Sequence, residues 1–339
     1  MKILIVKLSS LGDLFHALPA VHNIKTGLGA EIHWVTQTEY AEIVQCFTDV
    51  DRVIPFPRHS LAKDLRVFWR RLRMWDYDYV LDMQGLLKSA VIAFLARGRR
   101  KIGPSFQREG AFLFYSAVAN RRDRGRHAVD QCMDTVRYLG LSCLNLDFPV
   151  AFQPAGRSEP RPRVGMLPLS RWPTKNWPEA SFAAVGRALR EQRDATIYLL
   201  GGPGDRPVCE RIEREISGAG EGRAGSVVNL AGTMSLPATG GLIGELDLLI
   251  ANDSGPIHMA AAVRTPALVV FGPTDPSRTG PYGSIHRVVR ANRECQPCFS
   301  RTCRFGDTPC LKEVTPDRVI EEALRILDAA GRRAGGTAE

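Results

Sequence analysis

Four short segments place acidic, basic or hydroxyl side chains directly after an apolar run, and three of the four also contain glycine. The most distinctive is NDSGPIH at 252–258, where Asp253 ends the run and Ser254, Gly255 and His258 follow. Unpaired N–H groups at a helix start can hold an anion, and a carboxylate can hold a hydroxylated group. This segment therefore suggests a bound diphosphate beside a hydroxylated group; the alternative is that Asp253 caps the helix and His258 belongs to the core.

The segment LPLSRWPTKNWPEASF at 167–182 points to a phosphate as well. Its hydroxyl and basic side chains precede an expected helix start at Pro178, where the positive end of the helix dipole favours an anion. The spacing is not that of a P-loop. The candidate phosphate contacts in this segment are Ser170, Arg171, Thr174 and Lys175.

The two remaining segments carry weaker signals. In LLGGPGDRP at 199–207, Gly201 and Gly202 would let a nucleotide approach the backbone. In KLSSLGDLFH at 7–16, Gly12 permits a tight turn, and Asp13 then lies in the first helical turn, over the edge of the sheet. The alternative for this segment is that Ser9, Ser10 or Asp13 only caps the helix.

Apolar runs typical of buried strands alternate with helical periodicity along the whole chain. This alternation predicts parallel sheets covered on both faces, and the length predicts two domains. The stretch FQPAGRSEPRPR at 152–163 has the composition of a linker. We therefore expect Rossmann-like, doubly wound domains at 1–155 and 160–325, with ligands in a cleft between the carboxyl ends of their sheets.

The charge is concentrated in the first half of the chain. Residues 1–150 hold 21 Lys and Arg against 15 Asp and Glu, which is +6 of the total +9. The basic stretches at 58–75 and 97–127 would suit an anionic partner or simply a solvated helix face. No nucleic-acid motif accompanies them, and no apolar run is long enough to span a membrane, so we expect a cytoplasmic protein that does not bind nucleic acid.

The eight cysteines fall into two groups. Four scattered ones, Cys143 among them, are typical of small core residues. The others, Cys295, Cys298, Cys303 and Cys310, lie within sixteen residues and have the ligand number of a structural zinc or iron site. The alternative is four reduced thiols or disulfides.

Taken together, the motifs VKLSSLGDLFHALPA, DMQGLLKSA, SRWPTKNWP and NDSGPIHMAAAVRTPALVVFGPTDP resemble glycosyltransferase family 9, the ADP-heptose:lipopolysaccharide heptosyltransferases. The resemblance runs in order from residue 1 to about 325 and is closer to the heptosyltransferase I form. It implies the GT-B architecture, with the acceptor bound by the first domain and the nucleotide sugar by the second.

The resemblance also implies roles for individual residues. Asp13 corresponds to the catalytic base of an inverting transfer of heptose from ADP-heptose to the Kdo region of lipid A, with no metal needed for catalysis. Asp253 and His258 correspond to donor contacts, with Ser254 and Gly255 beside them. The acceptor contacts implied are Lys7, Ser10, Gly12, Gln84, Lys88, Arg108 and Arg126.

A Kdo-lipid A acceptor is polyanionic and lies at a membrane. This predicts peripheral contact with the cytoplasmic face of the inner membrane, made by the Arg- and Trp-containing stretch 58–75. The alternatives are heptosyltransferase II or another family 9 enzyme with a different acceptor, and a non-catalytic nucleotide-sugar-binding protein. A Rossmann dehydrogenase is disfavoured because KLSSLGD lacks the Gly-x-Gly-x-x-Gly fingerprint.

Overall fold

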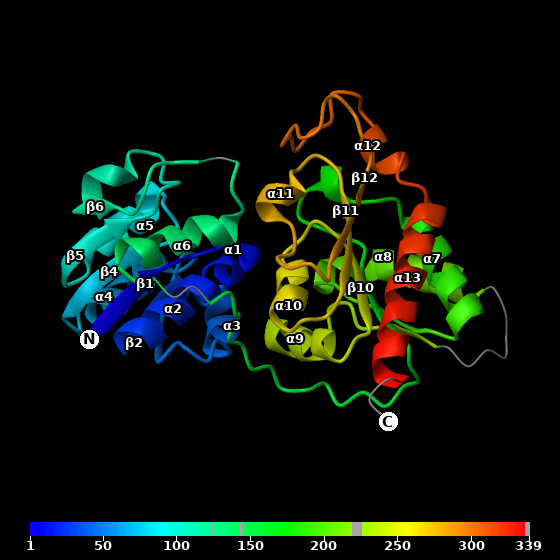
Figure 1. The fold of residues 1–339 in the computed structure, drawn as a ribbon, viewed down its shortest axis with the longest axis horizontal. Coiled ribbons are helices and arrows are strands. Elements are labelled where there is room, and N and C mark those ends of the chain that lie inside the picture. The colour runs from blue at the N-terminus through cyan, green and yellow to red at the C-terminus, as the bar shows by residue number, and fades with distance from the viewer. Residues whose placement is uncertain (124, 143–144, 219–225, 336–339) are drawn as a thin grey trace. The chain divides into compact units, whose positions relative to one another are not determined.

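The computed structural model describes residues 1–123, 125–142, 145–218 and 226–335. Cys143, which we expect in the core, and Arg124 of the basic stretch lie outside these residues. The chain forms two compact units, Met1–Ala151 and Phe152–Glu339. Each is an α/β unit with helices on both faces of a parallel sheet (Figure 1).

The first unit contains a six-stranded sheet in the order β3-β2-β1-β4-β5-β6, and the paired strands are parallel. Its elements are β1 (Lys2–Val6), α1 (Leu11–His16), α2 (Leu18–Leu28), β2 (Glu31–Gln37), η1 (Thr38–Tyr40), α3 (Ala41–Gln45), β3 (Arg52–Phe56), α4 (Leu61–Leu72), β4 (Tyr77–Asp82), α5 (Leu87–Leu95), β5 (Gly98–Gly103), η2 (Ala111–Phe114), β6 (Ala117–Val118) and α6 (Ala128–Tyr138).

The two faces of this sheet have separate cores because side chains alternate along each strand. On one face Leu4 and Val6 of β1 pack with Phe68 of α4 and with α5. Elsewhere in the unit, Phe15 of α1 lies edge-on to Phe47, with ring centroids 5.3 Å apart. The apolar run KILIV therefore forms a central strand buried on both faces.

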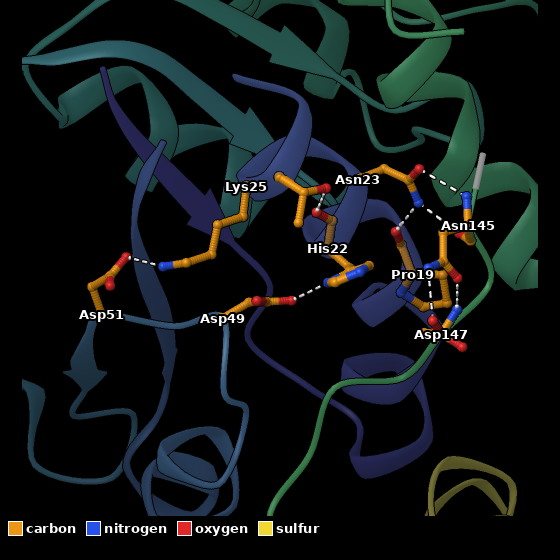
Figure 2. Close-up of polar contacts among 9 residues, drawn as sticks. Pro19, His22, Asn23, Lys25, Asp49, Asp51, Asn145 and Asp147 are labelled. Atoms are coloured by element: carbon orange, nitrogen blue, oxygen red, sulfur yellow. Dashed lines mark hydrogen bonds and ion pairs between the residues drawn. The ribbon is translucent and has the colours of Figure 1, made fainter. Parts of the chain in front are cut away.

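Polar contacts fix α2, which follows the Asp13 loop (Figure 2). His22 Nδ1 lies 2.8 Å from Asp49 Oδ2, and Lys25 Nζ lies 2.7 Å from Asp51 Oδ2. On the other side of the helix, the Asn23 amide donates to the Asn145 carbonyl over 2.6 Å. These bonds attach α2 both to the β2–β3 connection and to the last segment of the unit.

The second unit also has six strands, in the order β12-β11-β10-β7-β8-β9. Its elements are β7 (Arg163–Leu167), η3 (Pro173–Lys175), α7 (Glu179–Arg193), β8 (Thr196–Leu199), η4 (Pro203–Asp205), α8 (Arg206–Ser217), β9 (Val227–Asn229), α9 (Leu236–Gly244), β10 (Leu248–Asn252), α10 (Pro256–Ala262), β11 (Ala267–Phe271), α11 (Pro276–Thr279), β12 (Arg287–Arg290), α12 (Pro309–Lys312) and α13 (Pro316–Gly335).

Counted within each unit, both sheets follow the order 3-2-1-4-5-6 of the doubly wound dinucleotide-binding fold. The predicted fold class is confirmed. Two details of the fold are hidden in the sequence pattern. The segment after β1 forms two helices that meet at Ala17, and the charged segments GRRKIG and RVVR form the strands β5 and β12.

The chain that connects the units is bonded on both sides. Val150 forms an antiparallel bridge with Phe47. The stretch 152–163, which we interpreted as a linker, belongs to the second unit, and there the Glu245 carboxylate accepts from the Gly156 N–H over 2.7 Å. The residues on either side of the boundary between the units are therefore each held by contacts within their own unit.

Candidate functional site

Both sheets reverse their strand order between their two central strands, which is where doubly wound folds bind ligands. In the first unit this switch point lies between β1 and β4, and Asp13 and Gln84 lie in the segments that follow these strands. In the second unit it lies between β7 and β10, whose loops carry Lys175 and Asp253. The sequence motifs thus lie at the ends of the strands where the fold predicts a site.

Asp13 lies in the first turn of α1, with its side chain 40% exposed. Its Oδ2 accepts from the Ser10 N–H over 2.8 Å and from the Ser10 hydroxyl over 2.9 Å. Its Oδ1 lies 3.8 Å from Nδ1 of His16. Asp13 therefore takes part in helix capping, as the alternative interpretation predicted, and its side chain is still partly exposed.

The electrostatic surroundings keep this carboxyl group ionised. Burial alone would raise the pKa of Asp13, but hydrogen bonding to His16 and the positive charge of Lys7 outweigh burial and hold the pKa well below its usual range. Asp13 is consequently a carboxylate at any pH near neutrality, and it can accept a proton or a hydrogen bond from a hydroxyl group.

The loop that carries Asp13 is held by residues that we predicted to contact the acceptor. The Gln84 Oε1 accepts from the N–H groups of Leu8 and Ser9, both over 3.1 Å. Lys7 is buried, and its Nζ donates to the Met83 carbonyl over 2.5 Å. Lys7 and Gln84 therefore join the ends of β1 and β4, which sequence spacing could not reveal.

Asp82 organises the neighbouring turn and was missed by the sequence analysis. Its carboxylate accepts from the Gly85 N–H, the Ser89 hydroxyl and the Tyr115 hydroxyl, at 3.0, 2.8 and 2.6 Å. Burial raises the pKa of Asp82, and these three donors oppose the rise. Through these bonds Asp82 fixes the turn that precedes α5 and the first turn of that helix.

The other predicted acceptor residues differ in their freedom to bind. Lys88 and Arg108 are exposed on the first unit. Arg126 forms a two-pronged contact with the buried Asp134, whose two oxygens each lie 2.9 Å from its Nη1. Ser10 is exposed beside Asp13, whereas Gly12 is buried within α1.

In the second unit a largely buried ion pair occupies the switch point. Lys175 Nζ lies 2.5 Å from Asp253 Oδ2, and these side chains are 16% and 7% exposed. The Thr274 hydroxyl donates to the same oxygen over 2.5 Å. Lys175 and Asp253 were each predicted from the sequence, but their pairing was not, and Thr274 was not predicted.

Asn252 connects the two loops that carry this pair. Its Oδ1 accepts from the Trp177 N–H over 3.0 Å, and its Nδ2 donates to the Pro168 carbonyl over 2.6 Å. Lys175 also lies over the Trp172 ring, 4.8 Å from its centroid. The cation is thus fixed by an acid and by an aromatic face.

The remaining donor candidates surround the pair or face elsewhere. Among the described residues, the buried Ser254 hydroxyl has no hydrogen-bond partner, so it is available to a ligand. His258 is buried on α10, which begins after Gly255. Thr174 turns away from the pair, because its hydroxyl donates to the Ser300 carbonyl over 2.9 Å.

The other residues of these two loops also have local roles. The Ser170 hydroxyl donates to the Asn176 side chain over 2.9 Å, and Arg171 is exposed. The Gly202 N–H donates to Asp205 Oδ2 over 2.8 Å, and a side chain at Gly201 would collide with Asp205. Both glycines are therefore explained at least in part by the turn itself.

The cysteine cluster lines a cavity of about 250 Å³ next to Thr174 and Phe305. Burial, and then the neighbouring thiols, raise the pKa of Cys310. All seven cysteines of the described residues are free, and no group of His, Cys, Asp or Glu in this part of the chain is placed to hold a metal ion. The thiols are thus gathered but do not form a coordination site in this structure.

Comparison with known proteins identifies the family. Residues 65–308 match the family described as Glycosyltransferase family 9 (heptosyltransferase). The chain belongs to glycosyltransferase family 9. This membership makes it a glycosyltransferase, as the sequence predicted.

Individual family 9 members resemble it over nearly their whole length. Lipopolysaccharide heptosyltransferase 1 of Pseudomonas aeruginosa is 31% identical over 96% of this chain and 98% of its own. The structure described as E. coli heptosyltransferase WaaC with ADP has a TM-score of 0.79, with 26% identity over 96% of this chain and all of that one. WaaC with ADP-2-deoxy-2-fluoro heptose gives a TM-score of 0.75 at 25% identity, covering 96% and 99%.

The fold is therefore that of the GT-B glycosyltransferases. Across the described residues of this family 9 member, no helix is both long and apolar enough to cross a bilayer.

Proposed function

We propose that the protein is a heptosyltransferase of type I, which moves L-glycero-D-manno-heptose from ADP-heptose to the Kdo region of a lipid A acceptor in the synthesis of the lipopolysaccharide inner core. The similarity to heptosyltransferase 1 and to WaaC supports the donor and the acceptor class. The observation that carries the chemistry is Asp13, a carboxylate with a lowered pKa and a side chain 40% exposed, in the first turn of the helix that follows β1.

In this proposal Asp13 is the general base. The acceptor hydroxyl oxygen attacks the anomeric carbon of the heptose, the bond from that carbon to the ADP oxygen breaks, and ADP leaves with the electron pair. The hydroxyl proton passes to Asp13 as the new bond forms, and attack opposite the leaving group inverts the anomeric configuration. An ionised carboxylate is the form that this step requires.

The donor diphosphate is assigned to the switch point of the second unit. Lys175 supplies a positive charge that is fixed before the reaction, and such charge stabilises the ADP that leaves. The unpartnered Ser254 hydroxyl can donate to a phosphate or a sugar oxygen. Asp253, already bound to Lys175 and Thr274, accepts hydrogen bonds from heptose hydroxyls and keeps the cation in place. No metal is assigned to the catalytic step.

The acceptor is assigned to the first unit. Lys88 and Arg108 are exposed cations that suit the carboxylates and phosphates of Kdo-lipid A. Arg126, held by Asp134, adds a preorganised guanidinium. An acceptor of this kind places the enzyme at the cytoplasmic face of the inner membrane, as a peripheral protein.

A structural zinc or iron ion at the four clustered cysteines remains a separate proposal. It requires the thiols around the cavity to move into coordinating positions, since they do not hold that arrangement in the structure. Metal analysis of the purified protein tests it: about one equivalent supports it, and less than about a tenth of an equivalent contradicts it.

The test of the proposed function is transfer itself. The purified protein is incubated with ADP-heptose and a Kdo-lipid A acceptor, and ADP release is followed together with the mass of the product. One added heptose establishes the type I reaction. ADP-heptose binding without transfer to this acceptor contradicts it, and a heptosylated Kdo-lipid A acceptor then distinguishes a type II enzyme from a protein that only binds the nucleotide sugar.

A further inference from the structure

Exposed apolar side chains are concentrated on one part of the first unit. Of the fifteen large hydrophobic residues that are exposed in the described chain, nine lie between residues 61 and 113, on α4 and its end, on α5 and on η2. Phe112 and Leu113 of η2 are 53% and 74% exposed. Such clustering marks an interaction surface rather than the scattered apolar residues of an ordinary surface.

These elements form one continuous surface around the end of α5. Arg73 donates to the Leu95 carbonyl over 2.9 Å, and its guanidinium lies 5.0 Å from the centroid of Trp69. Lys101 donates to the adjacent Phe94 carbonyl over 2.6 Å and lies over the Phe94 ring. α4 and β5 therefore meet at the last turn of α5.

The surface continues from α5 to η2. The rings of Phe94 and Phe114 lie edge-on, with centroids 5.7 Å apart, so that η2 packs on the exposed side of α5. We name the surface formed by Trp69, Arg73, Phe94, Lys101, Phe112 and Leu113 the docking face. It combines protruding apolar side chains with cations that lie on aromatic rings.

The charge of the docking face is also one-sided. Burial and then the positive charge of Arg73 lower the pKa of Lys101, which means that the two cations lie near enough to repel. On the adjoining α4, Lys63, Arg66, Arg70 and Arg71 stand against Asp64 alone. Gathering like charges beside exposed apolar side chains is unfavourable in water and is relieved by an anionic, partly apolar partner.

We propose that the docking face binds the surface of an anionic lipid bilayer, with Phe112 and Leu113 entering the headgroup region and the cations contacting lipid phosphates. Charge complementarity selects a bilayer over an apolar protein surface, and aromatic rings that carry a cation over their face combine the apolar and charged groups that suit a membrane interface. The inference rests on the membrane contact in the proposed function and extends it from the stretch 58–75 to α5 and η2.

The test measures binding of the full chain to vesicles of 70% phosphatidylcholine and 30% phosphatidylglycerol, which contain no glycolipid acceptor. Phe112→Ser with Leu113→Ser should lower the vesicle partition coefficient about tenfold or more, because two largely exposed apolar side chains no longer insert. The matched control is Tyr138→Ser with Leu146→Ser, which removes exposed apolar side chains of the same unit away from the docking face and should leave binding within about twofold.

A second pair of substitutions tests the contribution of the cations. Arg70→Gln with Arg71→Gln should lower binding several-fold at low salt and less at high salt, whereas Arg206→Gln with Arg214→Gln on α8 should not. Unchanged binding in the Phe112 and Leu113 variant overturns the proposal. So does loss of self-association, measured by sedimentation, instead of loss of vesicle binding, because the face would then cover a second copy.

Transfer to a deacylated, water-soluble Kdo acceptor separates this inference from the proposed function. The Phe112 and Leu113 variant should keep the wild-type rate on that acceptor while losing vesicle binding. If the wild-type protein binds vesicles but transfers no heptose, the proposed function fails and the docking face stands.

Discussion

The two switch points share one strand order, but the carboxylate at one is partly exposed and the carboxylate at the other is buried in an ion pair. Asp13, after β1, is 40% exposed, and its closest contacts come from the neighbouring Ser10. Asp253, after β10, is 7% exposed and is bound to Lys175 and Thr274. The topology decides where each acid lies, and the loops from adjacent strands decide whether it is available to react.

This difference matches two chemical tasks. A general base needs an oxygen that can receive a proton, which an exposed carboxylate provides. A site for an anionic leaving group needs charge whose position is fixed beforehand, which the buried pair of Lys175 and Asp253 provides. If this assignment is correct, substitutions at Asp13 should affect the rate of transfer, and substitutions at Asp253 should affect stability and donor binding.

The largest effect on activity is expected for Asp13→Asn. The amide keeps the shape but does not accept the hydroxyl proton, so the transfer rate constant should fall by about 10²- to 10⁴-fold. The dissociation constant for ADP-heptose, measured by calorimetry, should stay within about twofold. Turnover near the wild-type level would show that another group is the base, and a large loss of donor affinity would assign Asp13 to the donor.

The largest effect on stability is expected for Asp253→Ala. Removing one partner leaves the buried Lys175 charge and the Thr274 hydroxyl unmatched, which should lower the free energy of unfolding by about 3 kcal/mol. Urea denaturation of the wild type and the variant measures this change in the free energy of unfolding. Asp253→Asn, which retains an acceptor for Thr274, should lose less, and both variants should bind ADP-heptose more weakly.

A smaller effect is expected for Gln84→Ala. The variant loses the acceptor for the Leu8 and Ser9 N–H groups and should lower kcat about tenfold by letting the Asp13 loop move. The KM for ADP-heptose should not change. Gln192→Ala on α7 is the matched control. An equal change in KM for the acceptor, with kcat unchanged, would instead support the predicted direct acceptor contact of Gln84.

The smallest effect concerns pH. Because the folded-state pKa of Asp13 is lowered, the stability that its carboxylate contributes is present above the unfolded pKa of about 4 and is lost as pH falls below it. The difference in unfolding free energy between the wild type and Asp13→Asn should therefore be constant from pH 8 to about 5 and shrink in more acidic solution. A difference that grows toward low pH would mean that the pKa is raised.

The sequence predicts those elements that have a clear pattern of apolar residues along their own length. Central strands such as KILIV are apolar because parallel sheets bury both faces, so alternation with helices gave the fold class. The strands β5 and β12 do not show the apolar pattern of a buried strand, because their residues are largely charged or partly exposed. At Ala17 the helical periodicity continues across the junction of α1 and α2, which hides the break.

For the candidate site, the sequence predicted which residues follow the strands but not which of them bond to one another. Asp13, Lys175 and Asp253 stand at strand ends in recognisable motifs. The bond from Lys175 to Asp253 spans 78 residues of chain, and the bonds from Leu8 and Ser9 to Gln84 span about as many, so local pattern holds no signal for either. Thr274 lies in the loop after β11, next to β10 in the sheet, and that adjacency is the signal that could have found it.

The bonded connection between the units has a mechanical consequence. The Ala151 N–H donates to Cys46 of the first unit over 2.9 Å, whereas Phe152 packs against Gly240 of α9 in the second. At Gly241 an added side chain would meet the Gln153 carbonyl at 1.9 Å, so glycine allows that backbone to lie flat on α9. The chain therefore passes from the first unit to the second at the peptide that joins Ala151 to Phe152, with fixed contacts directly on either side of that peptide.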